Sequence, residues 1–421
     1  MAKESFRFIH ASDLHLEQPL QDILDLPDHL RRTVIEAPWK AAEAVFEYAV
    51  VENVDFVVLA GDILNPAACG AQGVAFLLEQ FETLRERNIA VFWAGGRVDG
   101  PDRWPDSIAL PDNVHLMGKD AVEAHVFRRS GEPIATILGR SSNDNQIIRA
   151  AEYAHDPDGT YVIAVAYGEG DADTLAAESV DYWALGGRHQ MTVLQTEEPA
   201  IRYCGTPQAR RLQEEGGHGF LLVDVDAQDC VQVRQIEVDL VRYTEQDIDA
   251  EDQAMEDDLK RACAKRVSRL LSESHGRHLL VQWRVQLPGE PTGSLSPATL
   301  QELLHWLRRE FGQGQPACWS LDIEVLPPRK LPDQWQQEDT ILGDFLRIAE
   351  QSRKKAAKVD LQPIIDAETP ATKAWQVALA INQPEEQAAR LAQSTLLGID
   401  LLRGRKVDLL ASTRRFGGSD Q

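Results

Sequence analysis

The sequence predicts an α/β protein with a layered sheet, followed by a small α+β domain and a helical C-terminal region. Three observations support this. Residues 1–245 alternate apolar strand segments with amphipathic helical segments, residues 250–328 follow a helix–strand–helix–strand order, and residues 329–421 carry apolar residues at helical spacing. A chain of 421 residues is also longer than one compact core of ordinary size, which agrees with two or three domains.

The first part, residues 1–245, contains apolar segments that each predict a buried strand running into a loop. Amphipathic stretches such as APWKAAEAVFEYAVVEN and GVAFLLEQFETLRERN lie between the early strands, an alternation typical of an α/β layered sheet. Three later strands, IRYCGT, GFLLVDVD and VQVRQIEVDL, follow without long helices and predict a second sheet packed on the first. The earlier strands are FRFIHASD (6–13), DFVVLAGD (55–62), IAVFWAGG (89–96), YVIAVAYG (161–168) and DYWALGGRH (181–189).

The second part, residues 250–328, follows the polar, acidic segment YTEQDIDAEDQ, which we interpret as a domain boundary. An apolar stripe over residues 251–275 predicts one helix, and ATLQELLHWLRREF predicts another that begins near Pro297 and ends at Gly312. A half-buried strand is predicted after each helix. The apolar faces of these strands carry Val281, Trp283, Val285 and Leu287 in the first and Trp319, Leu321, Ile323 and Val325 in the second.

The third part, residues 329–421, is predicted to be helical after the Pro-Pro pair at 327–328. A second helical region covers roughly residues 371–402, and the basic tail RGRKVDLLASTRRFGGSDQ is expected to be mobile. The first helix is predicted from the stripe of Ile341, Leu342, Phe345, Leu346 and Ala349.

Net charge limits the partners of this chain. Of the formal charge of −24, residues 331–421 contribute almost none, because they carry 12 Lys and Arg against 13 Asp and Glu. The first 330 residues are therefore acidic, which argues against strong unassisted binding of duplex DNA. A small basic groove, or a partner that supplies positive charge, is still compatible with this composition.

The expected location is the cytoplasm, with no membrane partner. No apolar run reaches the roughly 18 residues of a membrane helix, and the start MAKESFRFIHASD lacks a signal peptide. The five cysteines are scattered and form no CxxC pair, as expected for reduced thiols.

Polar residues follow the predicted strands at their C-terminal ends, the edge of an open α/β sheet where ligands bind. Carboxylates and imidazoles that converge from separate strands suit Mn, Fe or Zn in a phosphoesterase site. A single such residue is weak evidence, and the ordered set is stronger. The set comprises Asp13 and His15 in a D-x-H motif, Asp62 in GD, Asp99 at the end of GGRVD, Tyr167 and Gly168 at the end of VAYG, and His189 in GGRH.

Five blocks of the sequence resemble those of the SbcD/YhaO-type DNA double-strand-break repair exonucleases, which are calcineurin-like metallophosphoesterases. The blocks are FIHASDLHLEQP, VDFVVLAGDIL, VFWAGGRVDGPDR, VDYWALGGRHQ and IRYCGTPQARRLQEEGGHGFLLVDVD, and they cover most of residues 5–245. A looser resemblance continues into QEDTILGDFLRIAEQ. The resemblance implies a four-layer α/β/β/α sandwich, a small α+β capping domain and a helical C-terminal region.

The resemblance also implies which metal ligands are present. The family's first metal takes the D-x-H pair, the GD aspartate and the last His of GHxH, which correspond to Asp13, His15, Asp62 and His189. The second metal shares Asp62, but its other ligand positions hold Arg97, Tyr167 and Gly187. Val98 replaces the His expected to protonate the leaving oxygen. One divalent metal is therefore expected, with Mn preferred over Fe or Zn, and no second metal.

The catalytic residues predicted on this basis are Arg97, Asp99 and His189. The hypothesis for Arg97 is that its side chain takes the space of the second metal, either holding a substrate phosphate or pairing with Asp62. The fixed charge and the bidentate fork of its guanidinium match a phosphate group.

Two functions remain open from the sequence. One is a divergent metal-dependent phosphodiesterase, resembling the nuclease subunit of a repair complex. The other is a catalytically inactive scaffold that binds an SMC-like ATPase or DNA ends. The family resemblance suggests an SbcC/YhaN-like coiled-coil ATPase as partner through the C-terminal helices, and a homodimer is left open. The chain has no P-loop, so ATPase activity would belong to the partner.

Other basic residues are assigned structural roles. His10 has no partner at ligand spacing, so a surface or helix-face position is expected, and His218 is expected in a turn that shapes the sheet. Arg210 and Arg211 follow the GTPQ turn, where surface positions are favoured over a phosphate contact.

Overall fold

The computed structural model of the chain divides into two compact units. Unit 1 comprises Met1–Gln246, Ala264–Trp283 and Leu304–Asp322, and unit 2 comprises Asp247–Cys263, Arg284–Leu303 and Ile323–Gln421. The structure describes residues 4–23, 25–143, 147–155, 159–249, 256–286, 297–326 and 333–355, with the short segments 391, 394–395, 398–399 and 401–402.

The first sheet lies in unit 1 and has the strand order β12-β11-β1-β2-β3-β4. β1 to β4 are parallel neighbours, whereas β11 runs antiparallel to β1 and β12 antiparallel to β11. This order brings the C-terminal ends of β1, β2 and β3 to one edge. The strands are β1 (Phe6–Ala11), β2 (Phe56–Leu59), β3 (Ala90–Trp93), β4 (Val114–Leu116), β11 (Gly219–Val225) and β12 (Val231–Glu237).

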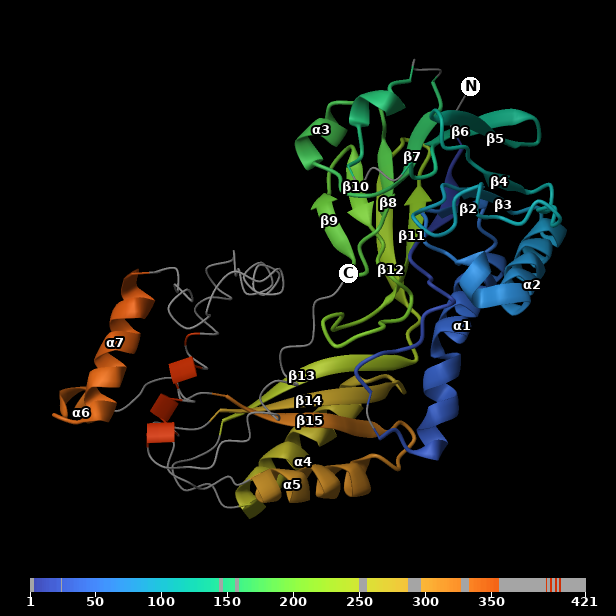
Figure 1. Ribbon diagram of the computed structural model, residues 1–421. Helices are drawn as coiled ribbons and strands as arrows, with labels where there is room; N and C mark the ends of the chain where they lie inside the picture. Colours follow the sequence, from blue (N-terminus) through green and yellow to red (C-terminus); the bar gives the residue numbers. More distant parts are fainter. Residues whose placement is uncertain are drawn as a thin grey trace. The chain divides into compact units, whose positions relative to one another are not determined.

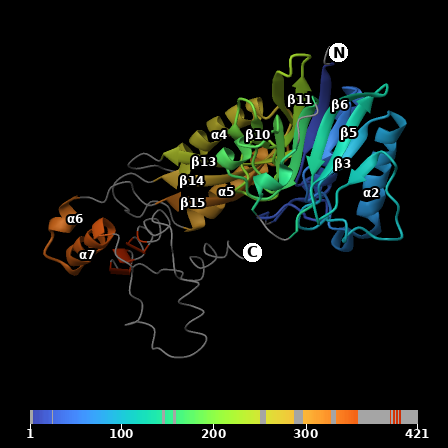
Figure 2. The ribbon, with the colours of Figure 1, turned by 90° about the horizontal axis from the view of Figure 1, so that it is seen from above.

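Two long helices, α1 (Asp28–Val51) and α2 (Pro66–Glu86), cover the outer face of this sheet (Figures 1 and 2). In α1, buried residues recur three or four positions apart, as in an amphipathic helix. In α2, Asn65 caps the first turn by accepting from the amides of Ala67 and Ala68, and Pro66 occupies the first helical position. Both helices are therefore fixed by local sequence and by their apolar stripes.

The second sheet, also in unit 1, has the order β5-β6-β7-β8-β10-β9. Its central strands β6, β7, β8 and β10 are parallel, and β5 and β9 pair antiparallel at the two edges. Its outer face packs against the short helices η1 (Ala150–Tyr153) and α3 (Ala172–Ala176). The strands are β5 (Glu123–Arg129), β6 (Glu132–Gly139), β7 (Tyr161–Tyr167), β8 (Tyr182–Gly186), β9 (Thr192–Gln195) and β10 (Ala200–Tyr203).

An apolar core rich in aromatic rings fills the space between the two sheets. Phe8 stacks on Phe56 with ring centroids 5.1 Å apart and meets Tyr182 edge-on at 5.4 Å. With helices outside both sheets, the predicted four-layer α/β/β/α sandwich is confirmed (Figure 1). His10 is fully buried in this region, so the expectation of a surface position was wrong. Its Nδ1 faces the Tyr182 hydroxyl at 3.1 Å and its Nε2 the Leu185 carbonyl at 3.2 Å.

The predicted assignment of strands to sheets was partly wrong. Of the three later strands expected to form the second sheet, only β10 lies in it, while β11 and β12 extend the first sheet. β7 and β8, expected in the first sheet, lie in the second. The hairpin of β5 and β6 was not predicted. Strand periodicity reports burial, but it carries no information on which distant strand becomes the neighbour.

The α+β region has the predicted order of elements: α4 (Glu256–Glu273), β14 (His278–Gln286), α5 (Pro297–Phe311) and β15 (Cys318–Leu326). A third strand, β13 (Val241–Asp249), joins them in the order β13-β14-β15. The segment from Tyr243 to Asp249, interpreted as part of a domain boundary because it is polar, is therefore strand. Leu287, expected on the β14 face, lies outside the described residues.

In the C-terminal region, the described helices are α6 (Asp333–Gln337) and α7 (Ile341–Lys355), and α7 confirms the first predicted helix. Leu346 packs with Trp335 and Ile399 in a small apolar cluster. Most of the second predicted helical region, residues 371–402, and the basic tail lie outside the described residues. Among the described helices, none combines the length and apolar character needed to span a bilayer.

Candidate metal centre

Loops at the C-terminal ends of β1 and β8 bring together Asp13, His15 and His189, whose candidate ligand atoms all lie within 4.8 Å of one another. Asp13 and His15 are buried and His189 is half-buried. The Nε2 atoms of the two histidines are 3.2 Å apart. Two atoms bound to one transition-metal ion at about 2.0–2.2 Å lie at most about 4.4 Å apart, so the 3.2 Å between the two imidazole nitrogens fits a shared ion.

Asp13 offers one free oxygen to this group. Its Oδ2 accepts hydrogen bonds from the Ser12 hydroxyl at 2.5 Å and from the Gly187 amide at 3.0 Å. Its Oδ1 is buried, accepts no hydrogen bond from the described residues, and lies 3.9 Å from His15 Nε2. Burial raises the pKa of this carboxyl group. A buried oxygen without a donor is costly unless a cation binds it, so the geometry fits a metal ion.

The site backbone adopts left-handed conformations at three candidate ligands: φ is 54° at Asp13, 42° at His15 and 52° at Asp62. L-residues adopt this region at a cost, and such strain clusters at functional sites. The two loops hold each other in place, because the Asp13 amide donates to the Gly61 carbonyl at 2.9 Å and the His15 amide donates to the Asp62 carbonyl at 3.1 Å.

Two glutamates orient the histidine rings. Glu214 Oε1 lies 2.7 Å from His189 Nδ1, and Glu17 Oε1 lies 3.4 Å from His15 Nδ1. Each contact leaves the Nε2 atom of the ring free to face the other candidate ligands of the metal ion, which is the arrangement typical of metal-ligating histidines. Burial opposes ionisation of Glu214, but His189 and the Arg210 amide outweigh it and lower its pKa to about 2. The sequence did not reveal this role of Glu214, although the residue lies within the block IRYCGTPQARRLQEEGGHGFLLVDVD that carries part of the family resemblance.

Asp62 follows β2 and lies beside the group of three, with Oδ2 3.7 Å from His15 Nε2. Its Oδ1 accepts from the backbone amides of Arg97 at 2.7 Å and Val98 at 3.1 Å. Its Oδ2 accepts from the Tyr167 hydroxyl at 2.6 Å. Burial, followed by the neighbouring Asp62 charge, raises the pKa of Tyr167. The phenol therefore acts as a neutral donor to Asp62.

Asp99, predicted as a catalytic residue, holds the loops in place. One oxygen accepts from the amides of Asp62 and Gly96, and the other from the Ile63 amide and the Trp93 indole. Burial, and then repulsion by Asp62, raises the pKa of Asp99 to about 7. With both oxygens used in this way, the geometry supports a positioning role for Asp99.

The family model of the calcineurin-like phosphoesterases matches residues 6–190, which carry Asp13, His15, Asp62 and His189. This N-terminal part of the chain is a calcineurin-like metallophosphoesterase domain. The resemblance inferred from the sequence blocks is thus confirmed for the superfamily and for its YhaO-type members.

One curated relative is the uncharacterized metallophosphoesterase YhaO of Bacillus subtilis (strain 168). It is 35% identical over 232 residues, which are 52% of this chain and 57% of YhaO. The alignment thus spans little more than half of YhaO. Among solved structures, TT1561 of Thermus thermophilus matches with a TM-score of 0.30 and 11% identity, covering 55% of this chain and 98% of that one. That likeness is too low to bear on fold or function.

Within the metallophosphoesterase domain, the expectation that the Arg97 side chain takes the space beside Asp62 was wrong, whereas its role as a phosphate contact stays a prediction. Its side chain is exposed and makes no hydrogen bond or ion pair with the residues that the structure describes. The group that reaches Asp62 is the phenol of Tyr167, which enters from the end of β7 in the second sheet. Arg97 contributes to Asp62 only through its backbone amide.

Arg210 is also placed differently from the prediction. It is 2% exposed, and its guanidinium donates to the carbonyls of Leu14 and Gln208, with a longer bond of 3.4 Å to His15. Burial lowers its pKa to about 10. It therefore clamps the D-x-H loop from inside. His218 does shape a turn, since its ring nitrogens face the carbonyls of Thr206 at 3.1 Å and Glu214 at 2.9 Å.

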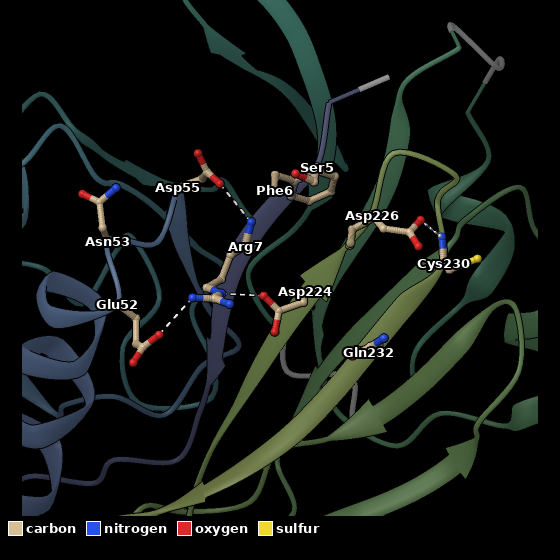
Figure 3. Close-up of a pocket in the computed structure, with 11 residues that line it drawn as sticks. Ser5, Phe6, Arg7, Glu52, Asn53, Asp55, Asp224, Asp226, Cys230 and Gln232 are labelled. Carbon is tan, nitrogen blue, oxygen red and sulfur yellow. Dashed lines mark hydrogen bonds and ion pairs between the residues drawn. The ribbon is translucent and has the colours of Figure 1, made fainter. Parts of the chain in front are cut away.

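A cavity of about 330 Å³ lies at the opposite, N-terminal end of β1 (Figure 3). Arg7 crosses it and pairs with Glu52 at 2.9 Å and with Asp224 at 2.5 Å. Its amide also donates to Asp55, which pairs with Arg129. These carboxylates are used in joining β1, β2 and β11, so we assign this cavity a structural role.

Proposed function

We propose that the metallophosphoesterase domain hydrolyses phosphodiesters with a single divalent ion held by Asp13, His15, Asp62 and His189. Mn is the preferred ion, with Fe or Zn as alternatives. The observation that carries this proposal is the convergence of two imidazole Nε2 atoms on the unpaired Asp13 Oδ1, with the ring of His189 oriented by Glu214. Carboxylate and imidazole ligands together suit these metals.

The protein groups around the ion have distinct tasks. When bound, such an ion polarises a phosphoryl oxygen and lowers the pKa of a bound water. Glu214 keeps His189 Nε2 directed at the ion, and Arg210 holds the loop that carries His15. Hydrolysis then depends on a substrate phosphate being held beside this group of ligands.

Arg97 is the proposed phosphate contact. Two other arginines near the site are already paired, since Arg188 bonds to Glu169 and stacks on Tyr203, and Arg211 bonds to Glu214. The exposed Arg97 side chain has no such partner among the described residues, and its backbone contacts Asp62 directly. A guanidinium in this position can form two parallel hydrogen bonds to a phosphate.

As a cellular role, we propose a divergent SbcD/YhaO-like DNA repair nuclease subunit that works with an SMC-like coiled-coil ATPase. Exposed apolar residues of α7, including Ile341 and Ile348, support a docking role for the C-terminal helices. The acidic charge of the chain favours DNA contact through a partner over unassisted binding. A homodimer is the alternative assembly.

The competing function is a scaffold without catalysis, which is favoured by the phenol that contacts Asp62 where the family has a second ion. Hydrolysis of bis-p-nitrophenyl phosphate in manganese, together with metal content by mass spectrometry, separates the two. The enzyme should bind metal and lose at least about 100-fold in activity in His189→Ala, a ligand loss larger than that of a supporting residue. His305→Ala, an exposed helix residue, is the control. A metal-free, inactive wild type would establish the scaffold.

A further inference from the structure

Tyr167 is built into the site by the residues that surround its ring. A Cβ atom added to Gly61 would lie 2.7 Å from Tyr167 Cδ2, and one added to Gly96 would lie 2.9 Å from the same atom. At Gly187, a Cβ would come within 3.3 Å of Cε2, and the φ of +100° further favours glycine. Three glycines from separate loops thus leave room for this aromatic ring.

The hydroxyl of Tyr167 uses a specific acceptor position on Asp62. A carboxylate has about four lone-pair positions. Two backbone amides occupy Oδ1, and the Tyr167 hydroxyl occupies one position of Oδ2 at 2.6 Å. The remaining position is on the oxygen that lies 3.7 Å from His15 Nε2. Asp62 therefore has one lone pair left, on the side of the histidines.

We propose that Tyr167 is a positioning residue that limits this centre to one ion. Its hydroxyl takes the Asp62 lone pair that a bridging second ion would need, and its ring fills the adjoining space. The inference rests on the proposed function, because it concerns the same ion site. The family resemblance implies that a second ion would share Asp62 with the first, in the two-metal arrangement that clamps a transferring phosphoryl group. Here the shared position is held by a neutral hydrogen-bond donor, which also orients Asp62 toward the first ion.

The first test separates the hydroxyl from the ring. Tyr167→Phe keeps the ring between the glycines and removes the donor. Manganese binding, measured by equilibrium dialysis, should stay at one equivalent per chain and weaken about 10-fold, as for other groups that orient metal ligands. Tyr153→Phe is the matched control, since this buried tyrosine packs on Trp183 in the outer core of the second sheet. Unchanged affinity in Tyr167→Phe would overturn the positioning role.

The second test replaces the ring by a metal ligand. The double variant Arg97→Asn with Tyr167→His removes a cation beside the site and offers an amide oxygen and an imidazole next to Asp62. It should bind two manganese equivalents, and its electron paramagnetic resonance spectrum should change from that of an isolated ion to that of a coupled pair. If the double variant binds only one manganese equivalent and shows the spectrum of an isolated ion, the claim that Tyr167 limits the centre to one ion is overturned.

The wild type distinguishes failure of this inference from failure of the proposed function. One bound ion without hydrolysis would reject the phosphodiesterase and leave the role of Tyr167 standing. Two bound ions with hydrolysis would reject the role of Tyr167 and the single-ion form of the proposed function, but would keep the phosphodiesterase activity. A wild type that binds no ion would overturn both. If the double variant does not fold, the manganese affinity of Tyr167→Phe still decides the positioning role.

Discussion

The two ends of the first sheet both gather carboxylates, but they balance the negative charge differently. At the N-terminal end, Arg7 pairs with Glu52 and Asp224, and Arg129 pairs with Asp55. At the C-terminal end, Asp13 Oδ1 is buried and receives no hydrogen bond from the described residues. The first end is a cavity whose charges are paired with one another, and the second is a set of ligands that needs an external cation.

The comparison teaches that, in this protein, the presence of a surface cavity is a poor guide to where a ligand binds. The described cavity of about 330 Å³ lies at the end where the charges are already paired. The evidence for a ligand is at the other end, in an unpaired buried oxygen, strained loop conformations and oriented histidine rings. Substitutions at both ends can break or sharpen this comparison.

The largest effect is expected for Asp13→Asn. Loss of the anionic ligand should reduce phosphodiesterase activity at least about 100-fold, since ligand loss exceeds the effect of a supporting residue. In the metal-free protein, however, stability at neutral pH should rise by about 1 kcal/mol, because the substitution removes a buried charge whose Oδ1 accepts no hydrogen bond from the described residues. Asparagine tolerates the positive φ at this position.

The pH dependence of stability gives an independent check on Asp13. Burial raises the pKa of Asp13 in the folded protein above the ordinary value of 3.8. The folded state then binds more protons than the unfolded state just above pH 3.8, so this group lowers stability as pH rises through its folded pKa. Urea unfolding of metal-free wild type and Asp13→Asn should diverge as pH rises. If the difference in unfolding free energy between the two proteins became smaller as pH rises, it would contradict the conclusion that the folded state raises the pKa of Asp13.

A smaller effect is expected for Glu214→Gln, which keeps the shape of the side chain and removes its charge. Because Glu214 orients His189, metal affinity and activity should fall about 10- to 100-fold. The neighbouring Glu215→Gln, an exposed position, is the control. Calorimetric titration with manganese measures the change. Equal metal affinity in both variants would show that Glu214 does not orient the ligand.

The smallest effect is expected at the other end of the sheet. Arg7→Gln removes partly exposed ion pairs with Glu52 and Asp224, each worth roughly 0.5 kcal/mol, so stability should fall by about 1 kcal/mol. Activity and metal affinity should not change, since β1 separates this residue from the metal centre. If Arg7→Gln lost metal binding and kept its stability, the assignment of a structural role to the N-terminal end of the sheet would be wrong.

The sequence by itself determined the α/β layers, the order of elements in the α+β region, and the set of polar residues at strand ends. Periodicity records which side chains are buried, and the positions of Asp13, His15, Asp62 and His189 just after apolar strands record that each lies at the C-terminal end of a strand. The ligand assignment for these four residues stays a prediction, and the structure brings Asp13, His15 and His189 within reach of one ion.

Tertiary structure alone decided which strand neighbours which, and which side chain meets Asp62. The hydroxyl that bonds Asp62 lies 105 positions along the chain, on a strand of the other sheet, while the nearby Arg97 points to solvent. Arg210 is buried for the same reason, since two of its three carbonyl partners, Leu14 and His15, lie in a loop about 195 positions away. Such contacts depend on how loops from separate sheets meet, and local sequence patterns report only the burial of each segment.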